Sequence, residues 1–177
     1  MNRLNYVCLS IIFLYLGVIE RTSAQSKDST PLRLAVAGIT HGHSGWILRR
    51  GSQTDITLSG IYEPNADLAQ QQAKKYKLPT SLFYTDLKKM LDEVKPEAVV
   101  AFGSIYEHLA VVEACAPRGI HVMVEKPLAT TLAHVTRMEQ LARKHNIHLL
   151  TNYETSWYPT TEKTYRLVND SSYVGAV

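Results

Sequence analysis

The stretch Ile120-His-Val-Met-Val-Glu-Lys-Pro-Leu128 gives the most direct indication of how this chain folds. Its apolar residues Val122, Met123 and Val124 predict a short buried strand, which runs into an acid, a lysine and a proline. In an open parallel sheet, ligands bind just beyond the carboxyl ends of the strands. We therefore expect the side chain of Lys126 to face a bound ligand.

The segments on both sides of this stretch alternate between strand and helix patterns. The predicted strands cover residues 32–37, 56–62, 82–84, 98–102, 122–124 and 147–151. The predicted helices cover residues 46–50, 66–76, 87–94, 107–118, 131–145 and 160–167. The run 98–102 is almost entirely apolar, which is typical of a parallel strand buried on both faces. Strand and helix patterns that alternate with short connections predict an α/β fold with a doubly wound parallel sheet.

The first residues differ in composition from the rest of the chain. Arg3 precedes an apolar run over residues 6–19, and the small residues Thr22-Ser23-Ala24 follow. This order predicts a Sec-type signal peptide over residues 1–24, and hence an exported protein, periplasmic or secreted. The alternative is an uncleaved membrane anchor, although the run is shorter than the roughly 20 apolar residues that span a bilayer.

Composition narrows the class of protein further. The length of 177 residues suits one full domain and part of a second. The net charge of +3 comes from scattered basic residues, whereas a nucleic-acid partner would need them clustered on one face. Cys115 is the only cysteine after the predicted signal, so we expect no disulfide framework. Its apolar helical surroundings predict a small buried side chain.

A glycine-containing turn, Gly38-Ile-Thr-His-Gly-His43, joins the first predicted strand to a helix. This geometry can place a pyrophosphate at the start of a helix. Thr40 and His43 occupy positions where the dinucleotide-binding pattern has glycine, and Gly42 is displaced by one residue. A plain strand-to-helix turn therefore remains an alternative for this segment.

Glu63 at the end of the second strand favours the dinucleotide interpretation. A carboxylate at this position can accept hydrogen bonds from the adenosine ribose hydroxyls. It would repel the 2′-phosphate of NADP, so we expect NAD rather than NADP as the cofactor. An exposed glutamate before a proline turn is the alternative. His41 and His43 also suggest a metal site. No carboxylate or thiol lies at ligand spacing from them in the sequence, so we predict no metal ion.

These residues together resemble the Gfo/Idh/MocA family, which includes glucose–fructose oxidoreductase and inositol dehydrogenase. The resemblance covers residues 32–152 and is carried by Leu34-Ala-Val-Ala-Gly38, Glu63, His108 and above all Gly119-Ile-His-Val-Met-Val-Glu-Lys-Pro-Leu128. It implies an NAD(P)-binding Rossmann domain over residues 31–152. It also implies that residues 153–177 begin an α+β substrate domain, whose catalytic groups this sequence does not contain.

The resemblance implies a hydride transfer between nicotinamide and a hydroxyl or carbonyl of a sugar, a cyclitol or a derivative. Lys126 is then the expected catalytic residue, with Glu125 orienting it and Pro127 fixing the backbone, in the cis form. We expect a desolvated cleft to lower the pKa of Lys126. The expected cofactor-binding residues are Gly38, Thr40, His41, Gly42, His43, Glu63, Gly103, Ser104, His108, Glu125, Lys126 and Pro127.

The expected partners are a dinucleotide and a small carbohydrate-like substrate. A full-length form can also be a homo-oligomer. We expect no nucleic-acid partner. His108 can either contact the cofactor or support the structure near it. Two other functions remain open. The chain can be an inactive dinucleotide-binding module or a truncated fragment, or it can be a different reductase on the same fold, such as an amino-acid or biliverdin-type reductase.

Overall fold

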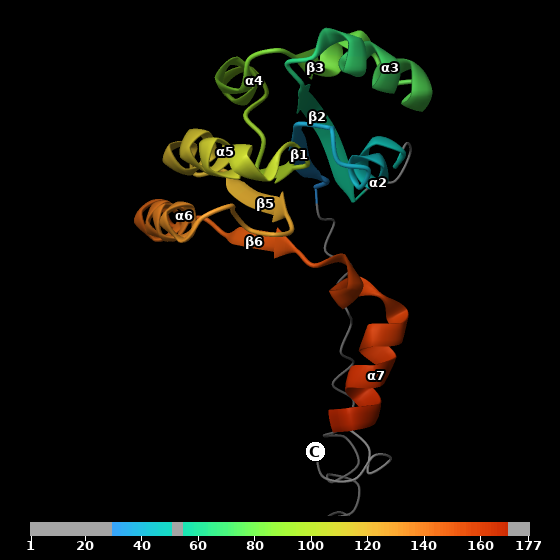
Figure 1. Cartoon of the computed structure of the whole chain (residues 1–177). Coiled ribbons are helices and arrows are strands. Elements are labelled where there is room, and N and C mark those ends of the chain that lie inside the picture. Colours follow the sequence, from blue (N-terminus) through green and yellow to red (C-terminus); the bar gives the residue numbers. More distant parts are fainter. Residues whose placement is uncertain (1–29, 51–54, 170–177) are drawn as a thin grey trace, which may run out of the picture. The chain divides into compact units, whose positions relative to one another are not determined.

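A computed structural model describes residues 30–50 and 55–169 of the chain (Figure 1). The predicted signal peptide and the last residues of the predicted second domain lie outside this part. Among the described residues, no helix combines the length and the apolar character needed to cross a membrane.

Six parallel strands form a single sheet, as the sequence predicts. They are β1 (Leu32–Ala37), β2 (Ile56–Tyr62), β3 (Phe83–Tyr84), β4 (Ala98–Ala101), β5 (His121–Glu125) and β6 (Leu149–Asn152). Their order across the sheet is β3-β2-β1-β4-β5-β6. The first described strand, β1, therefore lies in the middle of the sheet; the chain continues outward to β3 and then crosses back to β4. The crevice between the carboxyl ends of β1 and β4 is the switch point at which doubly wound folds bind ligands.

Helices connect these strands. The α-helices are α2 (Ser44–Leu48), α3 (Ala66–Tyr76), α4 (Leu87–Val94), α5 (His108–Cys115), α6 (Leu132–His145) and α7 (Pro159–Asn169). Four short 3₁₀ segments are η1 (Thr80–Leu82), η2 (Ile105–Glu107), η3 (Ala116–Arg118) and η4 (Glu154–Trp157). None of the described residues beyond Asn152 is buried, and the start of a second domain at residue 153 stays a prediction.

Side-chain caps define where the longer helices begin. Asn65 accepts a hydrogen bond from the Leu68 N–H at 3.0 Å, which confirms the predicted start of α3. Asp86 accepts from the Lys89 N–H at 2.9 Å and starts α4. Such caps satisfy backbone N–H groups that have no partner inside the helix.

Two helix predictions need correction. The first predicted helix, 46–50, lies two residues earlier, at Ser44–Leu48, because the turn after β1 closes by hydrogen bonds from Ser44 and Gly45 N–H to His41 and Gly42. The helix predicted over 107–118 is α only to Cys115. Pro117 has no N–H to donate to the preceding turn, so the last turn tightens into η3 and ends at Gly119, whose φ is +69°.

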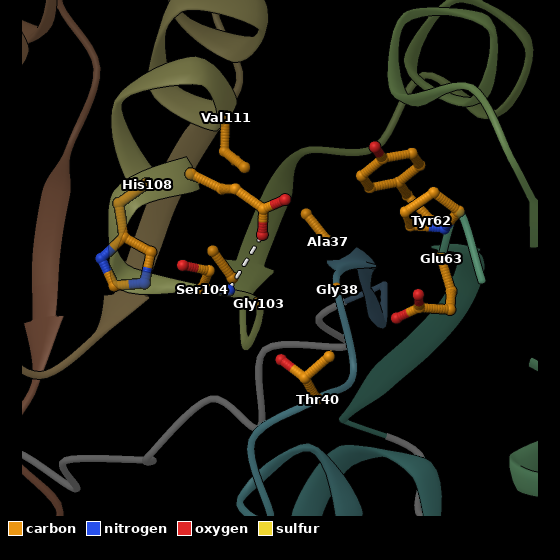
Figure 2. A pocket seen from close by; sticks show the side chains of 12 residues that line it. Ala37, Gly38, Thr40, Tyr62, Glu63, Gly103, Ser104, His108 and Val111 are labelled. Carbon is orange, nitrogen blue, oxygen red and sulfur yellow. Dashed lines mark hydrogen bonds between the residues drawn. The ribbon is translucent and has the colours of Figure 1, made fainter. Parts of the chain in front are cut away.

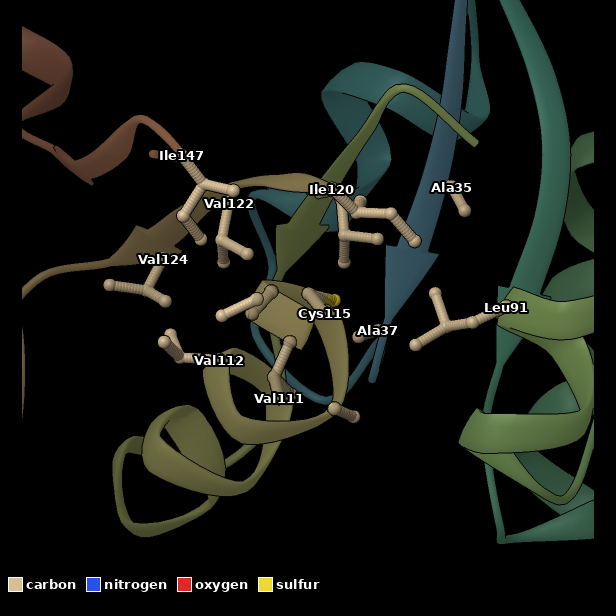
Figure 3. Packing of buried hydrophobic residues seen from close by; sticks show 14 of the residues in the cluster. Ala35, Ala37, Leu91, Val111, Val112, Cys115, Ile120, Val122, Val124 and Ile147 are labelled. Carbon is tan, nitrogen blue, oxygen red and sulfur yellow. The ribbon is translucent and has the colours of Figure 1, made fainter. Parts of the chain in front are cut away.

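The strands bury alternate residues on two faces of the sheet, and different helices cover each face. Ala35, Val99 and Val122 pack with residues of α4, α5 and α6. Figure 3 shows Ala35 and Val122 in this cluster, together with Leu91 of α4 and Val111 of α5. Leu34 and Val36 point the other way, toward Leu48 of α2 and the partly buried side chains of α3. Cys115 is fully buried in the first cluster, as predicted, and this burial raises the pKa of its thiol to about 12.

Candidate cofactor and active site

A small pocket lies at the switch point, where β1, β2 and β4 end (Figure 2). Its volume is about 90 Å³, whereas pockets that enclose a drug-sized ligand hold roughly 300–1,000 Å³. It can therefore hold one section of a dinucleotide, with the remainder lying along the open edge. The lining residues are Ala37, Gly38, Thr40, Tyr62, Glu63, Pro64, Ala101, Gly103, Ser104, Glu107, His108 and Val111.

Gly38 and Gly103 form the floor between the two central strands. The backbone of Gly38 has a φ of +75°, a conformation that side-chain-bearing residues rarely adopt. A Cβ on Gly38 would lie 2.5 Å from the Cα of Gly103. Both the backbone angle and this close approach therefore require glycine at position 38. The predicted importance of Gly38 thus has a structural reason that holds before any cofactor binds.

The rest of the turn after β1 is held against β4. The His41 N–H donates to the Phe102 carbonyl at 2.9 Å, and the Thr40 hydroxyl reaches the same oxygen at 3.4 Å. Gly42 is different, because a Cβ placed there would meet no atom within 4 Å. The turn therefore does not need glycine at position 42, although Thr40 lines the pocket as predicted.

Glu63 lies at the carboxyl end of β2 and is only 3% exposed. One carboxylate oxygen accepts the Ile39 N–H at 3.2 Å, and the other accepts the Asn65 N–H at 2.9 Å. The alternative of an exposed glutamate is therefore wrong. An ionised carboxylate offers about four acceptor positions, so Glu63 can hold the turn after β1 and still accept hydroxyl groups in the pocket.

Glu107, in the loop after β4, is a pocket residue that the sequence interpretation missed. The Ser104 N–H donates to Glu107 Oε2 at 2.9 Å, and the Ser104 hydroxyl accepts the Tyr106 N–H at 3.3 Å. Glu107 also lies within 3.0 Å of the Cβ position of Gly103. The spacing Ser-x-x-Glu is the signature of a capping box, so the sequence did contain this signal.

Tyr62 is a second lining residue that the sequence did not indicate. Burial, followed by the charges of Glu107, Glu63 and Asp86, raises the pKa of its phenol above the ordinary value of 10.0. The hydroxyl group therefore stays protonated at neutral pH. It can donate a hydrogen bond to a ligand beside the two carboxylates.

His108 begins α5 and is almost completely buried, with an exposure of 1%. Its Nδ1 lies 3.0 Å from the Leu128 carbonyl, which joins α5 to the loop after Pro127. Burial lowers the pKa of the imidazole, outweighing the opposing hydrogen bond to Leu128 and the charge of Glu125. A neutral ring donates from Nδ1 and leaves Nε2 as an acceptor. Of the two predicted roles, the structural one is thus present.

Glu125 is a buried carboxylate at the carboxyl end of β5, with an exposure of 2%. Oε2 lies 2.9 Å from His43 Nδ1 and accepts the Asn152 amide at 3.0 Å. Oε1 accepts the Lys126 N–H at 3.1 Å. Burial alone would raise the pKa of this carboxyl, but these hydrogen bonds and the nearby His43 lower it below the ordinary value. Glu125 therefore holds the Lys126 backbone, and an effect on the Lys126 amine stays a prediction.

His43 connects Glu125 to a second carboxylate. Its Nε2 lies 3.1 Å from Glu154 Oε2 in η4, and its ring stacks on the Trp46 indole with centroids 3.9 Å apart. His41 is more exposed, and its Nδ1 lies 3.9 Å from Glu125 Oε2. The structure thus brings together the turn after β1, the end of β5 and the segment after β6.

Lys126 follows Glu125 directly, and its peptide bond to Pro127 is cis, as expected. Its side chain is exposed. The expected desolvated cleft is therefore not formed by the described residues. Lys126 lies beyond the end of the strand next to β4, which is the expected position for a group that acts at the switch point.

Comparisons with known proteins agree with this arrangement. Residues 32–153 match the Gfo/Idh/MocA family of oxidoreductases, described as having an NAD-binding Rossmann fold. The match covers well over half of the chain. The chain therefore belongs to this family, and it carries the dinucleotide-binding fold of an oxidoreductase.

Individual relatives show the same kinship. The chain is 34% identical over 99 residues to a myo-inositol 2-dehydrogenase of Thermotoga maritima, covering 56% of this chain and 29% of the relative. Among solved structures, a probable dehydrogenase from T. maritima is 27% identical, with a TM-score of 0.68, over 78% of this chain and 41% of that one. The myo-inositol 2-dehydrogenase of Lactobacillus plantarum, at 21% identity and a TM-score of 0.67 over 79% and 41%, supports the fold alone. The chain spans 29–40% of the length of the curated relatives it matches.

Proposed function

We propose that the chain is the cofactor half of an NAD-dependent oxidoreductase that acts on a CH–OH group of a sugar, cyclitol or related compound. The observation that carries this proposal is the convergence of Gly38, Glu63 and the loop 103–108 on one pocket at the switch point. The myo-inositol 2-dehydrogenase of T. maritima among its relatives supports the substrate class.

The residues of the pocket fit a dinucleotide. Gly38 and Gly103 keep the crevice between β1 and β4 free of side chains. Glu63 keeps acceptor positions free for the ribose hydroxyls and carries the charge that disfavours a 2′-phosphate. We therefore expect preference for NAD over NADP, as an electrostatic consequence of one carboxylate.

Lys126 is the proposed proton-handling group. Bound NAD would supply the hydride acceptor for the hydroxyl-bearing carbon, and the hydroxyl proton would need an acceptor on the protein. An amine beyond the end of β5 can receive or relay that proton when it is within hydrogen-bond reach. Glu125 sets the direction of the Lys126 backbone through the hydrogen bond to its N–H.

Binding and turnover test this proposal separately. Thermal unfolding of the whole chain should shift upward with NAD, and less with NADP at equal concentration, because only the folded pocket binds the dinucleotide. If neither dinucleotide stabilises the chain at millimolar concentration, the proposed function is wrong.

Lys126→Ala tests the chemistry in a protein that joins this chain to a substrate domain, with inositols and aldoses as substrates and NADH formation as the measurement. Turnover should fall about 100-fold or more, while stabilisation by NAD stays unchanged. Lys144→Ala, an exposed lysine on α6, is the matched control and should keep wild-type turnover.

A dinucleotide-binding module without catalysis is the second candidate, and the exposure of Lys126 favours it. In that case NAD stabilises the chain, no turnover is seen with any of these substrates, and Lys126→Ala changes neither measurement.

A further inference from the structure

Two histidines and a carboxylate converge beside the pocket, from segments far apart in the sequence. His41 and His43 lie on the turn after β1, and Glu125 ends β5, 82 residues after His43. One potential ligand atom from each lies within 4.8 Å of the other two, and within residues 30–50 and 55–169 no other group of this kind occurs. The sequence predicted no metal because it showed no carboxylate near the histidines. The fold supplies one.

The distances suit a small divalent ion. Zinc binds imidazole nitrogen and carboxylate oxygen at roughly 2.0–2.1 Å, which places tetrahedral ligand atoms about 3.4 Å apart. His43 Nδ1 lies 2.9 Å from Glu125 Oε2, and His41 Nδ1 lies 3.9 Å from the same oxygen. Shifts of well under 1 Å would bring these two pairs to the required spacing, and the third pair, between the two histidines, lies within 4.8 Å. His41 is 36% exposed and His43 is 22% exposed, so an ion can enter from solvent.

The ring nitrogens of both imidazoles already have partners in the protein. Nε2 of His43 lies 3.1 Å from Glu154 Oε2, and its Nδ1 lies 2.9 Å from Glu125 Oε2. A neutral imidazole has one N–H and can donate to only one of these carboxylates, so the other contact is favourable only when a proton or a metal ion lies between the two atoms. Nδ1 of His41 accepts the His43 backbone N–H at 3.3 Å, and metal binding would replace this hydrogen bond.

The surroundings have the form of a supported metal site. A metal-binding histidine usually donates its other ring N–H to a carboxylate, which fixes the ring and its tautomer. Glu154 has this position relative to His43. The Asn152 amide and the Lys126 N–H hold the Glu125 carboxylate, and the Trp46 indole stacks on the His43 ring. His43 and Glu125 are therefore each held by several neighbours, whereas His41 contacts mainly His43.

We propose that His41, His43 and Glu125 bind a divalent transition-metal ion of the Zn²⁺ class. Two imidazoles and one carboxylate provide three protein ligands, and the fourth position is open to water, as in zinc sites that are not purely structural. Glu154 is a positioning residue that acts through His43. This inference goes beyond the proposed function, and its test uses no cofactor, so either can fail without the other.

Calorimetric titration of the tag-free, metal-stripped whole chain with ZnCl₂ tests the site. We expect one zinc per chain, with low-micromolar or tighter affinity. His43→Gln and Glu125→Gln should each weaken binding about 100-fold or abolish it, because each removes one of three ligands. Glu154→Gln should weaken binding about 10-fold and leave the stoichiometry at one.

The chain contains a matched control in His121 and His148. The His148 N–H donates to His121 Nδ1 at 3.1 Å, and the rings lie 4.8 Å apart. This pair repeats the His41–His43 contact, but within residues 30–50 and 55–169 no carboxylate or thiol lies close enough to complete a three-ligand group with it. The double variant His121→Gln/His148→Gln should therefore bind zinc like the wild type.

Cobalt provides a measurement that needs no variant. Co²⁺ in the wild-type chain should give the intense visible absorption of a four-coordinate site, and added Zn²⁺ should remove it. The proposal is overturned by a weak six-coordinate spectrum, by the absence of saturable zinc binding, or by loss of binding in the His121/His148 control. If no saturable zinc binding is found, a proton on His43 rather than a metal ion lies between Glu125 and Glu154.

Discussion

Glu63 and Glu125 are both buried carboxylates at the carboxyl ends of parallel strands, but the protein holds them in different ways. Glu63 is held by backbone N–H groups, from Ile39 and Asn65. Glu125 is held mainly by side chains, from His43 and Asn152, with one backbone N–H from Lys126. The site is therefore built by backbone at β1, β2 and β4, and by side chains at β5 and β6.

This difference teaches what each half can do. A backbone N–H cannot rotate away, lose its proton or be exchanged by a single substitution. The backbone-built half therefore presents a fixed shape, suited to a cofactor that is always the same. An imidazole can change its tautomer, its proton or its metal, so the side-chain-built half can respond to what binds there.

The largest effect is expected from breaking the backbone-built half at Gly38. Gly38→Ala forces a side chain into a φ of +75° and places its Cβ 2.5 Å from the Gly103 Cα. Strain and the required backbone shift should lower the free energy of unfolding by about 3 kcal/mol, measured by urea denaturation.

Gly42→Ala is the control within the same turn. Its Cβ would have no neighbour within 4 Å, so its free energy of unfolding should stay within about 0.5 kcal/mol of wild type. Equal losses in both variants would show that Gly38 is not constrained by the contact with Gly103.

Glutamine substitutions compare the two carboxylates directly. Glu63→Gln directs an amide N–H₂ at a backbone N–H that cannot adapt, and should cost about 2 kcal/mol of unfolding free energy. Glu125→Gln should cost about 1 kcal/mol less in EDTA-containing buffer, since the His43 ring can change its tautomer. An equal or larger loss for Glu125→Gln would contradict the proposed division between backbone and side-chain support.

The smallest expected effect is on the pH dependence of stability, through the buried His108 that supports the side-chain-built half. Burial lowers the folded-state pKa of His108 below its ordinary 6.5, so acid protonates the unfolded state first. The stabilisation is complete above pH 6.5 and is lost as pH falls toward the folded-state value. Relative to His108→Gln, the wild type should lose about 1 kcal/mol between pH 6.5 and 5.5. A pH-independent difference between the two proteins would refute a neutral buried His108.

The fold and the backbone-built half could be predicted because their signals are local. Strand periodicity, the helix caps at Asn65 and Asp86, and Glu63 at the end of a strand can all be read from neighbouring residues. The alternation of strands and helices then predicts a parallel sheet. Glu107 was within reach too, since its capping-box spacing is present in the sequence.

The side-chain-built half could not be predicted in the same way. The partners of Glu125 are His43, 82 residues earlier, and Asn152, 27 residues later. Only the packing of β1, β5 and β6 side by side brings them together, and no spacing rule applies over such separations. The exposure of Lys126 was missed for a related reason, because burial depends on everything that surrounds a residue.

The stacking of Trp46 on His43 makes Trp46 an intrinsic fluorescence probe of the His43 ring. The chain has two tryptophans, and the other, Trp157, is largely exposed. A charged imidazole against an indole quenches its fluorescence. In a Trp157→Phe chain, the emission of Trp46 would thus report in real time whether a proton or a metal ion is bound at His43, between Glu125 and Glu154, without a dye or a coupled assay.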